Sequence, residues 1–124
     1  MRKELVTQFA QVLKSAAPHK PTKTQKKNIR TWCRALQTSI KHTGSLRGDS
    51  GEECCLEVLA RSVGGIRRYS SGLTLCKAPF EAATGFNDQT ILMNANDGTS
   101  GEVMLAHPEI AEALHLAVFG KGYR

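Results

Sequence analysis

Residues 24–41 repeat apolar and basic side chains at helical spacing. With about 100° between successive residues, an arc of about 100° collects the apolar side chains Ile29, Trp32, Cys33, Leu36 and Ile40. A second arc of similar width, on the other side, collects the cations Lys26, Lys27, Arg30, Arg34 and Lys41. The pattern predicts a helix over 24–41, capped by Thr22 or Thr24, with one side in the core and a basic side in solvent.

Positive charge is concentrated in the same part of the chain. Residues 1–47 hold eleven Lys or Arg and one acidic residue, whereas residues 48–124 hold six Lys or Arg and ten acidic residues. No acidic residue occurs from Lys14 to Arg47, so the helix forgoes the i,i+4 ion pairs that usually support an exposed helix. The asymmetry favours an anionic partner for the first half, or an acidic surface docked against it. A solubilising surface is the alternative.

The other segments predict further elements of a single domain. Apolar periodicity and caps predict helices over 3–15, 52–63 and 108–119, and Pro79 predicts a single helical turn that ends at Gly85. Residues 66–69 and 73–76 predict a hairpin, and residues 90–93 predict a strand followed by a turn over 94–98. The expected fold is α+β, with four main helices and a small antiparallel β hairpin or sheet. An N-terminal amphipathic helix plus Pro/Lys linker (1–23) would precede the core (24–124).

Metal binding and catalysis are not predicted. The four cysteines are isolated or adjacent and lack the paired spacing of a structural zinc site. Cys54 lies near the start of a predicted helix, but we expect Glu52 and Glu53 to raise its thiol pKa. We therefore expect no cofactor, no metal and no enzymatic activity, with buried free thiols suited to a reducing cytoplasm. No apolar run approaches the ~20 residues of a membrane span.

The predicted hairpin contains a second group of candidate binding residues. Arg67 and Arg68 can hold a phosphate by charge-assisted hydrogen bonds, while the ring of Tyr69 can stack on a base. The alternative is a charged hairpin edge that is protected from pairing with another chain.

Three motifs carry a resemblance that would cover residues 30–115. They are Trp32-x-x-Ala35-Leu36, then Glu53-Cys54-Cys55-Leu56-Glu57-Val58-Leu59, and then Asn96-Asp97 followed by Glu109-Ile110-Ala111. Together they resemble a group of small proteins encoded by bacteriophages and prophages, in which a Cys-Cys-Leu-Gly-Val-Leu helix follows a Trp-x-x-Ala-Leu helix. The chain departs from that pattern at Glu57, where the group has glycine, and in the separation of Leu75 from Pro79. The resemblance implies a phage accessory setting without an assigned biochemical activity.

These observations lead to one principal functional prediction and two alternatives. The principal one is a non-enzymatic phage protein in the host cell cytoplasm that counters a bacterial defence by sequestering an anionic target. That target would be a nucleotide signal or a nucleic-acid-bearing host complex, and a chain this short would form a homo-oligomer to build a pocket. The alternatives are a nucleic-acid-binding protein that contacts the phosphate backbone, and an adaptor that docks on an acidic host protein.

Overall fold

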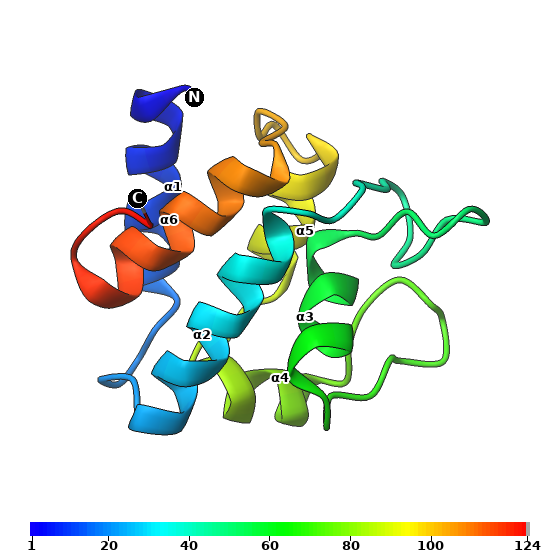
Figure 1. The fold of residues 1–124 in the computed structure, drawn as a ribbon, viewed down its shortest axis with the longest axis horizontal. Coiled ribbons are helices and arrows are strands. Elements are labelled where there is room, and N and C mark those ends of the chain that lie inside the picture. Colours follow the sequence, from blue (N-terminus) through cyan, green and yellow to red (C-terminus); the bar gives the residue numbers. More distant parts are fainter. Residues whose placement is uncertain (124) are drawn as a thin grey trace.

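Six helices make up the computed structural model, which describes residues 1–123 (Figure 1). They are α1 (Lys3–Ser15), α2 (Lys23–Leu36), α3 (Cys55–Val63), α4 (Lys77–Thr84), α5 (Thr90–Asp97) and α6 (His107–Phe119). The helix α6 packs against both α1 and α2, and α3 lies on the other side of α2. The helix α2 therefore lies between α6 and α3, while the turns over residues 64–76 lie at the far side of α3 from the C-terminal end (Figure 1).

The predicted α+β fold is wrong, because the described residues form isolated bridges but no strand or sheet. The predicted hairpin is reduced to one antiparallel bridge between Arg68 and Leu75. Its turn is present, since the N–H of Tyr69 donates to the carbonyl of Thr74 at 2.9 Å. The N–H of Cys76 also donates to the carbonyl of Arg67 at 2.8 Å, which completes the bridge. On the outer side, the side-chain amide of Gln89 bonds both the N–H and the carbonyl of Leu75, each at 2.8 Å. A side chain occupies the backbone groups that a further strand would use.

The predicted strand over 90–93 and turn over 94–98 are also wrong, because both belong to α5. The side chains of Leu92, Ala95 and Asn96 are buried, at the i, i+3 and i+4 spacing of a helix face. Gly98 ends the helix in the left-handed region, with φ 70°. The polar residues before it do not form a turn; Asn96 is fully buried and hydrogen-bonded within the core.

Two predicted helix boundaries are displaced by a loop that packs against the core. The helix α2 ends at Leu36, so Ile40 is 66% exposed instead of buried. The helix α3 begins at Cys55, because Glu53 pairs in extended backbone with residues 40–42: its N–H donates to the Ile40 carbonyl at 2.6 Å, and its carbonyl accepts from the N–H of His42 at 2.9 Å. Glu52 and Glu53 therefore lie outside the helix that was predicted to begin with them.

Other predicted features are confirmed. The helix α1 spans 3–15 as expected, and α6 begins beside Pro108 and ends at Gly120. Gly85 ends α4 as predicted, but α4 is an eight-residue helix that starts two residues before Pro79, in place of the predicted single turn. Thr22 caps α2: its hydroxyl accepts from the N–H of Gln25, whose side chain accepts from the N–H of Thr22.

Trp32 forms the centre of the core. Its side chain is 0% exposed, and its indole N–H donates to the Cys55 carbonyl at 2.8 Å, which joins α2 to α3. The helix α3 is buried at six consecutive residues, 55–60, as its wide apolar surface predicts. Because the inner side of α2 is held on α3 and α6, its outer side is presented to solvent as a rigid surface.

Candidate anion-binding face

The outer side of α2 carries five cations, which we call the α2 row: Lys23, Lys26, Lys27, Arg30 and Arg34. All are exposed except Lys26, which is half-buried. Lys23 joins the four predicted residues because the Thr22 cap starts the helix one residue earlier than expected. The row begins at the positive end of the helix dipole, and no acidic residue occupies the first turn. Cations and dipole therefore both favour an anion there.

The ion pairs within residues 1–123 leave this row out. They join Arg2 to Glu109, Arg61 to Glu53, Arg68 and Arg47 to Glu57, and Lys77 to Glu81. The glutamates at 53 and 57 are almost inaccessible, and each accepts two hydrogen bonds from one guanidinium. Four of the eleven acidic side chains are thus paired with cations outside α2.

Two predicted binding residues are engaged elsewhere. Lys41 lies beyond the end of α2, and its Nζ donates to the carbonyl of Leu105 at 2.6 Å. Burial of its ammonium group lowers the pKa of Lys41. Arg68 donates from Nε to Oε1 of the buried Glu57 at 2.7 Å. Neither cation lies in the α2 row, and Arg68 has an internal partner.

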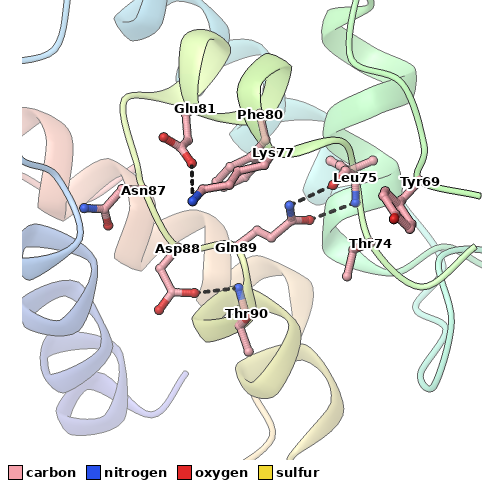
Figure 2. Close-up of a pocket in the computed structure, with 10 residues that line it drawn as sticks. All are labelled: Tyr69, Thr74, Leu75, Lys77, Phe80, Glu81, Asn87, Asp88, Gln89 and Thr90. Carbon is pink, nitrogen blue, oxygen red and sulfur yellow. Dashed lines mark hydrogen bonds and ion pairs between the residues drawn. The ribbon is translucent and has the colours of Figure 1, made fainter. Parts of the chain in front are cut away.

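Tyr69 lines a cleft of about 400 Å³ (Figure 2). The residues that line this cleft include none of the α2 row. Within the cleft Lys77 points toward Glu81, with 3.9 Å between Nζ and Oε2, and Asp88 accepts from the N–H of Thr90 at 3.0 Å. Two carboxylates against one ammonium make this cleft unsuitable for a phosphate. The neighbouring Arg67 is exposed. The predicted group of residues 67–69 is therefore not assembled into one anion site.

A second cleft, of about 500 Å³, adjoins the α2 row and was not predicted. It is lined by Arg30 of α2 and by His115, Phe119, Lys121, Gly122 and Tyr123 from the end of α6 and beyond. The Arg30 guanidinium lies over the ring of Phe119, 4.5 Å from its centroid. The ring of His115 is 4.5 Å from Phe119 and 5.7 Å from Tyr123, measured between centroids. We call this the aromatic cleft.

The deepest polar cluster has a structural role. Asn96 Oδ1 accepts from the N–H of Cys55 and from Nε2 of His107, each at 3.0 Å. Because Nε2 donates, Nδ1 of His107 is left to accept from the Ser39 hydroxyl, 2.6 Å away. Burial, followed by the charge of Lys41, lowers the pKa of His107 to about 4. A serine, a histidine and an asparagine that are joined by hydrogen bonds resemble a catalytic triad, but an imidazole of this pKa is a weak base at neutral pH.

The thiols differ from one another in chemistry. Cys33, Cys54 and Cys55 are buried and Cys76 is half-buried, all as free thiols. Contrary to the sequence expectation, the pKa of Cys54 is lowered, first by a hydrogen bond from Cys55 and then by backbone N–H groups at the start of α3. Burial raises the pKa of Cys33 to about 12. Cys54 faces a cavity of only about 80 Å³, which leaves little room for a substrate.

Comparisons with protein families, curated proteins and solved structures found no match to this chain. The resemblance to phage-encoded proteins therefore stays a prediction. Among residues 1–123, no three His, Cys, Asp or Glu side chains are grouped as a metal site requires. The helices of the same residues include none with the length and apolar character to cross a membrane.

Proposed function

We propose that this chain is a non-catalytic protein that binds the phosphate backbone of a nucleic acid through the α2 row. The observation that carries the proposal is the set of cations on α2 that have no acidic partner among residues 1–123, in a fold whose other ion pairs neutralise buried glutamates. From Lys26 to Arg34 the row spans about 12 Å, at 1.5 Å per residue. In a B-form duplex, one strand carries about three to four phosphates over that length.

The row is also costly to the isolated helix. Like charges at i,i+4, such as Lys26 with Arg30 and Arg30 with Arg34, destabilise a helix by roughly 0.2–0.5 kcal/mol per pair. Cations in the first turn oppose the helix dipole as well. A polyanion along the row removes both penalties, whereas a merely solubilising surface is served equally well by mixed charges.

The biological setting follows from the resemblance alone. We propose that binding serves a phage accessory role in the host cytoplasm, in which the protein sequesters a nucleic-acid-bearing component of a bacterial defence. A free nucleotide signal and an acidic host protein are the competing ligands. They differ from a nucleic acid in how binding responds to salt and to strand length.

The test is fluorescence anisotropy with a labelled strand of about 20 nucleotides, measured over a range of salt concentrations. The variant Lys26→Glu/Arg34→Glu reverses two charges in the row. It should weaken binding, and the log–log salt slope should become shallower by about 1.4, which is two phosphate contacts on a single strand. The matched control Lys3→Glu/Lys14→Glu reverses two exposed charges on α1 and should bind more nearly like the parent. Equal binding by the two variants would exclude the α2 row as the contact surface.

A further inference from the structure

The aromatic cleft shares one residue with the α2 row. Arg30 belongs to the row by its place on α2 and to the cleft by its position over Phe119. A strand whose phosphates lie along the row therefore reaches the cleft at Arg30, so one bound strand can contact both surfaces.

The fold builds this cleft by turning the chain back after α6. Gly120 takes the left-handed conformation that ends the helix, with φ 74°. At Gly122 an added Cβ would lie 1.8 Å from Oε1 of Glu112, so a larger residue would require the Glu112 side chain to move. The turn brings the carbonyl of Lys121 within 2.8 Å of Nδ1 of His115. Tyr123 thereby comes to lie against the ring of His115.

The lining groups suit a nucleobase next to a phosphate. Arg30 and Lys121 are exposed cations, and His115, Phe119 and Tyr123 are half-buried rings. A carbonyl only accepts, so Nδ1 of His115 carries the hydrogen and Nε2 is left to accept a hydrogen bond in the neutral ring. Aromatic rings and the guanidinium plane are the surfaces on which unpaired bases stack. The cleft therefore contains cations for a phosphate, aromatic rings for stacking, and a hydrogen-bond acceptor for the edge of a base.

From this juxtaposition we propose that the aromatic cleft takes one unstacked base of a single-stranded nucleic acid whose phosphates lie along the α2 row. The inference rests on the proposed function and narrows it to single strands. A duplex keeps its bases stacked on one another and presents only phosphates to the row. A single strand can turn a base out, so it gains the cleft contacts in addition to the phosphate contacts.

An abasic strand tests the base contact directly, because it carries the same phosphates and no bases. At one salt concentration, we expect the protein to bind an ordinary strand about ten-fold or more tightly than an abasic strand of equal length. Tyr123→Ala should reduce that preference while the affinity for the abasic strand stays the same. Tyr69→Ala is the matched control: it removes a tyrosine that is 57% exposed and lies outside the aromatic cleft, and it should keep the preference.

Arg30→Lys gives a second test that does not depend on the fold of the C-terminal turn. Lysine keeps the charge and loses the planar group, so the preference for bases should fall while the salt slope is retained. Circular dichroism melts identify any variant that fails to fold. Equal binding of ordinary and abasic strands by the parent protein would overturn the cleft proposal and leave phosphate binding intact. Absence of binding to every strand would overturn the proposed function itself.

Discussion

Protonation of His107 should control how the stability of the fold depends on pH. The imidazole is 2% exposed and is held neutral between Asn96 and Ser39, with a pKa of about 4 against 6.5 for a free side chain. Below pH 6.5 the unfolded chain takes up a proton at this ring that the folded chain does not. The free energy of unfolding therefore decreases as the pH is lowered from 6.5, and the contribution of His107 is lost by about pH 4.

The size of the effect follows from the two pKa values. Between about pH 7.5 and pH 4.5, the ring should remove about 2.5 kcal/mol from the free energy of unfolding. Glu109 titrates in a separate window: the hydrogen bond from Arg2 lowers the pKa of its carboxyl to about 2 from 4.5, so its contribution is lost only below 4.5. Between pH 7.5 and pH 4.5, the change in stability therefore comes from His107 and not from Glu109.

Urea unfolding at several pH values measures this loss. With a urea m-value of about 1–3 kcal/mol/M, the midpoint should move down by about 0.8–2.5 M across the window. His107→Gln keeps a polar side chain of similar reach and cannot titrate, so its stability should depend much less on pH, whatever its absolute value. If the variant loses stability as steeply as the parent protein, the reasoning about His107 is wrong.

Three further predictions concern the core. Asn96→Ala should lower the free energy of unfolding by about 3 kcal/mol, since buried hydrogen-bonding groups lose their partner; a loss below about 1 kcal/mol in urea unfolding would contradict the structural role. Arg68→Ala should cost about 2 kcal/mol because its glutamate partner is buried, whereas the exposed neighbour Arg67→Ala should cost little; equal losses would contradict this assignment. Iodoacetamide should label the half-buried Cys76 well before Cys33, which is fully buried with a pKa raised to about 12; mass spectrometry that finds equal labelling rates would refute the difference.

The helices with long apolar periodicity could be predicted from the sequence, and α5 could not. Residues 3–15 and the helix that begins beside Pro108 have long apolar patterns with clear caps. The helix α5 has only eight residues, and the sequence of its polar half is typical of a turn. In the structure Asn96 accepts hydrogen bonds from the N–H of Cys55 and from His107. That bonding is tertiary, so local preference alone favours the wrong element. The predicted hairpin forms only one bridge, and the outer backbone groups of Leu75 bond to the side chain of Gln89, a tertiary contact that the local pattern does not reveal.

The candidate site shows the same division. The face of α2 follows from helical spacing, which places four of its five cations correctly. The roles of Arg68 and Lys41 depend on partners that spacing does not reveal, namely Glu57 and the carbonyl of Leu105. For the aromatic cleft a weak signal exists: rings at 115, 119 and 123 recur every four residues across the end of α6. Only packing shows that this stripe meets α2.

The neutralised glutamates of α3 and its preceding loop have a consequence for how fast a ligand arrives. Because the buried Glu53 and Glu57 are each paired with an arginine, they weaken the positive field around α2 little. If the partner is the polyanion proposed above, the excess of positive charge in residues 1–47 would orient the molecule during a diffusional encounter. Such steering raises association rates well above those of uncharged surfaces, and the gain is largest in dilute salt.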